Sequence, residues 1–233
     1  MLAGGALLAA AGARFRTGRR LAGAEQVKVG ALLGTQDLPR RPVRVAGRIR
    51  CADPLRTPEG DRLVAYHRDV EVRLPGIGWR VIDRLRESRS FELWDHDGST
   101  MVDPGLAAEP LIVIPRVWHG APHELDETHR AAVERLAARH GTPLGARSTT
   151  RMLSVTDRLL VLAAPRRGED GRLRLAPPPD GYIISAVPLA DAMRLLGGAH
   201  RRLLGVAIGG LGAGGALLIA GLVAALVARL LDI

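Results

Sequence analysis

Histidines and carboxylates gather between positions 119 and 129 of the sequence. Imidazole and carboxylate groups are the usual protein ligands of catalytic zinc, which activates a bound water molecule for hydrolysis. The segment therefore permits a metal-dependent hydrolase, although its spacing matches no established zinc motif. A solvated loop that leads into a helix explains the same residues and is the favoured interpretation. The residues concerned are His119, His123, His129, Glu124, Asp126 and Glu127.

Two further groups with chemical potential have simpler explanations. Cys51 is the single cysteine, and it continues the apolar face of a predicted strand, which favours a small core residue over a nucleophile. The run Asp95-His96-Asp97 is typical of a turn between strands. No nucleophile, base and orienting group can be assembled from the sequence, so no catalytic residue, metal ligand or cofactor is predicted.

The segment from Leu203 to Ala228 carries no charged, amide or hydroxyl side chain. As a helix it would exceed the roughly 30 Å thickness of the hydrocarbon core, so it is predicted to span a membrane. A buried core helix is the alternative, but such a helix is usually shorter and keeps a polar stripe. Arg202 and Arg229 flank the run, where cationic groups meet lipid headgroups.

Glycines within this predicted span admit two interpretations. They match the dinucleotide fingerprint G-x-G-x-x-G, but they lie in an apolar run that no strand precedes, so nucleotide binding is not expected. Their four-residue spacing instead suits close helix packing and self-association, while the competing explanation is the general enrichment of glycine in membrane spans. The predicted packing residues are Gly205, Gly209, Gly210 and Gly214.

The arginines near the apolar segments predict an orientation. Only Arg229 lies beyond the predicted span, so the positive-inside rule places residues 14–202 in the cytoplasm. We therefore expect an integral protein of a bacterial plasma membrane, with the lipid bilayer as one partner. The arginines on the side of the central region are Arg14, Arg16, Arg19, Arg20, Arg194, Arg201 and Arg202.

The first residues, Met1 to Ala13, form a second uncharged segment that is too short for a full span. Arginines follow this segment, whereas a signal peptide carries its positive residues first, so anchoring is favoured over cleavage. An interfacial anchor and a spanning helix whose start lies further upstream both remain open.

The composition suits one sizeable domain with appended elements. The 233 residues are 47% hydrophobic with a net charge of +9, and the single cysteine excludes a disulfide framework. Aromatic residues make up only 3%, and no nucleic-acid-binding motif is present, so nucleic acid is not an expected partner. Attraction to anionic lipid explains the arginines beside the predicted spans.

The central region alternates apolar and polar side chains in the manner of β-strands. One such run extends from Pro42 to Cys51 and a second from Val64 to Leu74, and the two are predicted to pair as a hairpin with a long loop. A helix is expected from Asp126 to His140, where Gly141 ends it. Further strands are predicted at 79–85, 90–95, 100–103, 110–117, 152–155, 159–163, 172–175 and 182–186.

The predicted fold class is a mainly β soluble domain, antiparallel and barrel-like or sandwich-like, with one helical insertion. A C-terminal transmembrane helix and a short N-terminal apolar segment complete it. The predicted divisions are an N-terminal membrane anchor or truncated span at 1–13, a basic linker at 14–41, a β-rich domain at 42–187 with its helical insertion near 124–140, a juxtamembrane helix at 188–202, the span at 203–228 and a tail at 229–233.

Turn and core residues between Pro42 and Pro104 follow a fixed order. A V-x-G-x-V strand, here ending in Ile49, precedes a D-P-L-x-[ST]-P turn, a tyrosine-containing strand, a lone tryptophan and an F-x-L-x-D-x-x-G-x-x-x-V-D-P hairpin. This order resembles the GIDE-type domain of mitochondrial membrane-anchored ubiquitin ligases, and bacterial membrane proteins carry similar domains. The residues that carry the resemblance are Gly47, Asp53, Pro54, Pro58, Tyr66, Trp79, Phe91, Asp95, Gly98, Asp103 and Pro104.

The resemblance implies a domain beside the membrane that recruits or contacts other proteins. In the eukaryotic ligases a zinc-binding RING domain follows the second span, whereas this sequence holds only residues 229–233 after Ala228. Ubiquitin transfer is therefore not expected, and the predicted function is a membrane-anchored, non-catalytic interaction or scaffold domain with unidentified protein partners. The alternative is a membrane-bound enzyme, a metal-dependent hydrolase that uses His119, His123 and His129.

Overall fold

The computed structural model describes residues 2–103 and 111–197, which fall into two compact units. The larger unit is Ala24–Leu189, and the described part of the smaller unit comprises residues 2–23 and 190–197. Within the described residues, no helix combines the length and the hydropathy that a membrane span requires. The predicted span at 203–228, its glycines and Pro104 lie outside the described residues.

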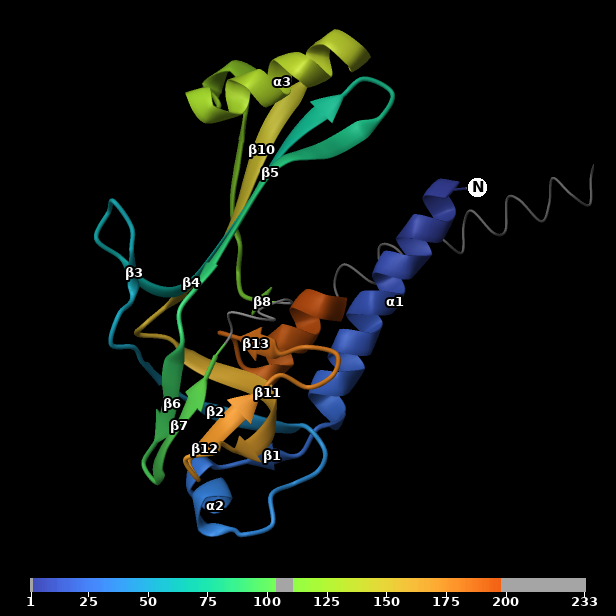
Figure 1. Cartoon of the computed structure of the whole chain (residues 1–233). Helices are drawn as coiled ribbons and strands as arrows, with labels where there is room; N and C mark the ends of the chain where they lie inside the picture. Colours follow the sequence, from blue (N-terminus) through green and yellow to red (C-terminus); the bar gives the residue numbers. More distant parts are fainter. Residues whose placement is uncertain (1, 104–110, 198–233) are drawn as a thin grey trace, which may run out of the picture. The chain divides into compact units, whose positions relative to one another are not determined.

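Five strands of the larger unit form a closed barrel (Figure 1). Going round the ring, they are β2 (Val43–Arg50), β6 (Phe91–Asp95), β7 (Gly98–Val102), β12 (Leu173–Ala176) and β11 (Arg158–Arg167), and β11 returns to β2. The β7–β12 pair is parallel and the others are antiparallel. This is the strand order of the OB-fold, so the prediction of a mainly β, barrel-like domain is confirmed.

The barrel interior is built by the alternation seen in the sequence. Val43, Val45 and Ile49 are buried, while the intervening side chains of β2 are more accessible. Phe91 and Leu93 of β6 join the same core. Short elements extend the sheet or pack beside it: β1 (Gln26–Val27), α2 (Val29–Gly34), β8 (Leu111–Ile112) and β13 (Ile183–Ser185).

A second, longer sheet is built from two insertions between barrel strands (Figure 1). The insertion between β2 and β6 contributes β3 (Leu55–Arg56), β4 (Arg62–Leu74) and β5 (Gly78–Ser88). The insertion between β7 and β11 contributes β9 (Arg116–Gly120), the 3-10 turn Pro122–Glu124, α3 (Glu127–His140) and β10 (Gly145–Ser154). β10 lies between β4 and β9, and β5 pairs with the other side of β4.

Three sequence predictions about strands need correction. The hairpin between 42–51 and 64–74 is wrong, because β2 belongs to the barrel and β4 to the long sheet. The strand predicted at 110–117 divides into β8 and β9 around Pro115, which has no amide hydrogen to donate. β10 begins at Gly145 rather than 152, since its first half alternates between polar and small side chains and gives no hydrophobic signal.

The smaller unit contains α1 (Leu2–Gly23) and a second helical segment at 190–197. α1 continues past the predicted boundary at residue 13 and includes the arginines that follow it. A Cβ atom at Gly18 would lie 3.3 Å from Cε of Met193, so the two helical segments pack closely at this glycine. Membrane anchoring by residues 1–13 stays a prediction.

Candidate interaction surface of the long sheet

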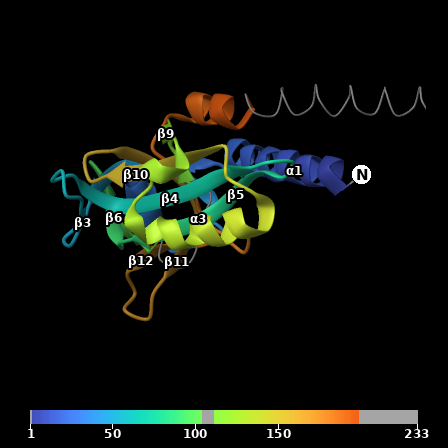
Figure 2. The same ribbon diagram turned by 90° about the horizontal axis from the view of Figure 1, so that it is seen from above.

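The long sheet has one apolar and one polar face because its side chains alternate. Val72, Leu74 and Ala146 form a buried cluster with Val133 and Leu136 of α3, and Figure 2 shows α3 lying along this side of β4. The opposite side, named here the polar face, carries Asp69, Glu71, Trp79, Arg84, Arg86, Val117, His119, Arg147 and Arg151.

Asp69 is the centre of an ion-pair cluster on the polar face. Its Oδ1 accepts from Arg86 at 2.7 Å and from Arg84 at 3.3 Å, and its Oδ2 accepts from Arg151 at 3.2 Å. Burial by itself raises the pKa of Asp69, but the hydrogen bond from Arg86 and the three positive charges outweigh it, so the pKa lies below its usual value. The carboxylate thereby ties β4 to both neighbouring strands.

Glu71 and Arg147 form a second link across the same strands. The guanidinium Nε and Nη2 donate to the two carboxylate oxygens at 2.5 and 3.0 Å, which is a bidentate pair. The same guanidinium lies over the ring of Trp79 on β5, and that ring meets His119 of β9 edge-on at 6.4 Å between centroids. These contacts connect side chains of β5, β4, β10 and β9 across the polar face.

The edge strand β9 is the most accessible part of this surface. It pairs with β10 on one side, and among the described residues no strand pairs with its other side. Val117, on the polar face, is 48% exposed, and Trp118, on the face toward α3, is 38% exposed. The indole of Trp118 lies against Gly120, where a Cβ atom would overlap the ring. An accessible edge with unpaired backbone groups and exposed apolar side chains is a template for strand addition.

The three histidines of the metal hypothesis occupy different environments. His129 is buried, and its Nε2 lies 3.2 Å from Oδ2 of Asp83. His119 contacts Trp79 on the polar face, and His123 lies exposed in the 3-10 turn. In residues 2–103 and 111–197, no three histidine, cysteine, aspartate or glutamate side chains are grouped to hold a metal ion. The geometry therefore does not unite the sequence cluster into a ligand set.

The residues that carry the resemblance to the GIDE-type domain have different structural roles. Gly47 permits close strand approach, because a Cβ atom there would lie 2.8 Å from the carbonyl oxygen of Trp94. Asp95 accepts backbone hydrogen bonds from Val29 at 3.1 Å and from Asp97 at 2.9 Å, which fixes α2 against the β6–β7 turn.

The structure distributes the remaining pattern residues over both sheets. Gly98 opens β7, Phe91 fills the barrel, and Asp103 follows β7. Tyr66 and Trp79 lie in the long sheet, and the connecting loop holds Asp53, Pro54 and Pro58. The described pattern residues are thus divided between the barrel and the insertion that follows β2, and they do not form a reactive site.

The ion-pair cluster itself was not predicted from the sequence. Its signal is the placement of Asp69 and Glu71 at alternate positions of one strand, with arginines at matching spacing in two others. Recognising that signal requires the strand pairing, which the sequence pattern left undefined. The sequence identifies Trp79 only through the resemblance to the GIDE-type domain.

Comparison of the chain with protein-family models, curated proteins and solved structures returned no match. The resemblance to the GIDE-type domain therefore stays a prediction.

Proposed function

We propose that this chain is a membrane-anchored, non-catalytic interaction domain that binds an extended segment of another protein along β9. The observation that carries the proposal is the edge of β9 that no described strand pairs with, together with the exposed Val117 and Trp118. Backbone hydrogen bonds to such an edge supply affinity, and alternate side chains supply specificity. The anchor is the apolar segment at 203–228, whose sequence alone supports it.

The side chains around β9 indicate the chemistry of the partner segment. Arg116 is exposed at the start of the strand, while Val117 and Trp118 offer apolar surface next to it. An added strand would match these side chains with an acidic residue near Arg116 and apolar residues beside Val117 and Trp118. The network of Asp69 and Glu71 supports the non-catalytic assignment, because both carboxylates are already held by arginines that maintain the sheet.

Photo-crosslinking from the edge strand tests this function. Trp118 is replaced by p-benzoylphenylalanine in the full chain in its native membrane, and a discrete crosslinked product is expected. Met101 on β7 is the matched control, because the residue is 39% exposed against 38% for Trp118. The substitution Val117→Lys is expected to remove the product, since edge lysines oppose strand addition.

The outcome distinguishes binding of a specific partner from nonspecific binding. A product that forms from position 118, is absent from position 101 and disappears in V117K supports the proposal. Equal capture from both positions, or a product unchanged by V117K, contradicts it. Thermal unfolding of V117K checks that the sheet remains intact.

A further inference from the structure

Two loops meet at the end of the long sheet where β4 ends. Residues 75–77 join β4 to β5, and residues 141–144 join α3 to β10. The amide of Leu144 donates to the carbonyl of Arg73 at 2.8 Å, and a Cβ atom at Gly141 would lie 4.0 Å from Cγ of Pro75. These two loops are named here the tip.

The tip exposes large aliphatic side chains. Leu144 is 66% exposed and Ile77 is 40% exposed. Gly76, Gly78 and Gly141 adopt positive φ angles that other residues rarely adopt, so the turns that present these side chains have a defined shape. Exposed aliphatic groups on turns of defined shape are available for a partner that would cover them.

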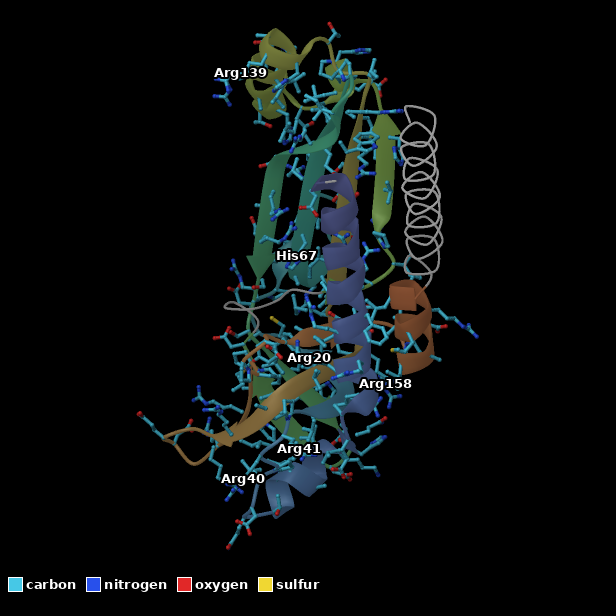
Figure 3. All side chains as sticks on the ribbon, turned by 90° about the vertical axis from the view of Figure 1, so that its right-hand side faces the viewer. Arg20, Arg40, Arg41, His67, Arg139 and Arg158 are labelled. Atoms are coloured by element: carbon cyan, nitrogen blue, oxygen red, sulfur yellow. The ribbon has the colours of Figure 1, made fainter. Side chains whose placement is uncertain are left out.

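The two segments that build the tip carry charges of one sign, although the carboxylate of Glu124 lies against Gly120, which pairs with Ala146. Segments 72–80 and 138–147 contain Arg73, Arg80, Arg139 and Arg147 and no aspartate or glutamate. Glu71 engages Arg147, whereas the other arginines are exposed, and Figure 3 shows Arg139 extending outward from α3. The polar face further down the sheet differs, because its arginines are matched by Asp69 and Glu71.

We propose that the tip is a membrane contact that inserts Ile77 and Leu144 into the interface of an anionic bilayer. Arg73, Arg80 and Arg139 would bind the lipid phosphates while their aliphatic stems remain near the acyl chains. A bilayer accepts two aliphatic side chains ringed by positive charge without any matching concave surface. This contact is independent of strand addition at β9.

Fluorescence of a label at the tip tests the inference in the purified full chain. Cys51 is the single cysteine, so C51A combined with I77C allows one environment-sensitive fluorophore at position 77. Vesicles contain either phosphatidylcholine alone or phosphatidylcholine with phosphatidylserine. A blue shift and rise in intensity are expected with the anionic vesicles only. The readout is local, so it does not depend on how the rest of the chain is held.

Matched variants distinguish a lipid contact made by the tip from the general attraction of a basic protein to anionic lipid. The same label at position 114, where Ile114 is 75% exposed between β8 and β9, is expected to stay unchanged. Replacement of Arg73, Arg80 and Arg139 by glutamine should weaken the lipid dependence strongly, because each arginine near the surface is worth about fivefold in partitioning. Replacement of Arg40, Arg41 and Arg158, which lie away from the tip in Figure 3, removes the same charge and should leave it intact.

Several results would overturn the inference. These are an unchanged label at position 77, equal shifts in the two lipids, and equal weakening by both arginine triples. A shift that needs an added protein rather than lipid would assign the tip to a protein partner instead. A crosslink at position 118 that persists while the label stays unchanged would leave strand addition standing and reject the membrane contact alone.

Discussion

The guanidinium carbon of Arg147 lies 4.4 Å from the centroid of the Trp79 ring. The same guanidinium forms the bidentate pair with Glu71, so it is held by an acid and an aromatic ring at once. A planar guanidinium suits both contacts together, whereas an ammonium group suits neither as well. The polar face therefore depends on arginine specifically, and not on positive charge alone.

Arg147→Lys should destabilise the larger unit by about 1–2 kcal/mol, because it removes the bidentate pair and most of the contact with Trp79. Chemical unfolding of the detergent-purified chain measures the loss. Arg166→Lys is the control, since Arg166 is an exposed residue of β11. Equal effects of the two substitutions would show that the arrangement around Arg147 is unimportant.

Asp69→Asn should cost about 2–3 kcal/mol at neutral pH, because it leaves three arginines facing a neutral amide. The pKa of Asp69 is lowered in the folded protein, so its contribution is present above the unfolded value of about 3.9 and is lost as pH falls through the folded value. Unfolding measured against pH should therefore show a smaller acid loss in D69N than in the wild type. Parallel curves for the two proteins would refute this role.

Gly47→Ala should destabilise the barrel by about 1–3 kcal/mol, since the new methyl group would press on the carbonyl oxygen of Trp94. Gly34→Ala provides the contrast, because a Cβ atom there meets nothing within 4 Å. It should be neutral or slightly stabilising at the end of α2. Thermal unfolding of both variants distinguishes a steric cost from a general effect of losing glycine.

Tyr182 is buried and its hydroxyl donates to the carbonyl oxygen of Leu175. Burial raises its pKa to about 12. The unfolded chain ionises near pH 10, so stability should decline from there up to the folded value. Tyr182→Phe should cost about 1 kcal/mol at neutral pH and lose part of this alkaline decline. A decline identical in the variant would remove Tyr182 as its source.

Chelation tests the alternative hypothesis that the histidines bind a catalytic metal ion. Since His119, His123 and His129 lie in separate environments, dialysis against EDTA should leave the unfolding temperature unchanged. His119→Ala should likewise leave the metal content of the purified chain unchanged. Stoichiometric zinc that is lost in this variant would instead restore the metal-dependent hydrolase.

The sequence pattern predicted individual elements best where one face is apolar and local signals are strong. β2 was predicted by the alternation of Val43, Val45 and Ile49, and α3 by helical spacing that ends at Gly141. β10 was largely missed because Ala146, Ser148 and Thr150 are small or polar on the face that packs toward α3. An alternating apolar pattern reveals a strand only where one face of the strand is buried. Most residues in this part of β10 are only partly buried.

Strand pairing and the polar face required information that is not local. The two alternating runs 42–51 and 64–74 look like hairpin partners in sequence, yet β2 pairs with β11 and β4 pairs with β10, both of which follow much later. Asp69 and Arg151 become neighbours only through the register that places Thr149 opposite Asp69. Single residues could be selected by type, but their grouping depended on this register.

The double insertion that builds the long sheet also has a consequence for the order of folding. The barrel closes when β2 pairs with β11, and both insertions lie between these strands in the chain. Closing the barrel therefore has a large cost in conformational entropy. Pairing β4 with β5 has a smaller cost, because a tight turn joins them. We expect the β4–β5 hairpin to form early and the barrel to close late and slowly, as in other domains dominated by contacts distant in sequence.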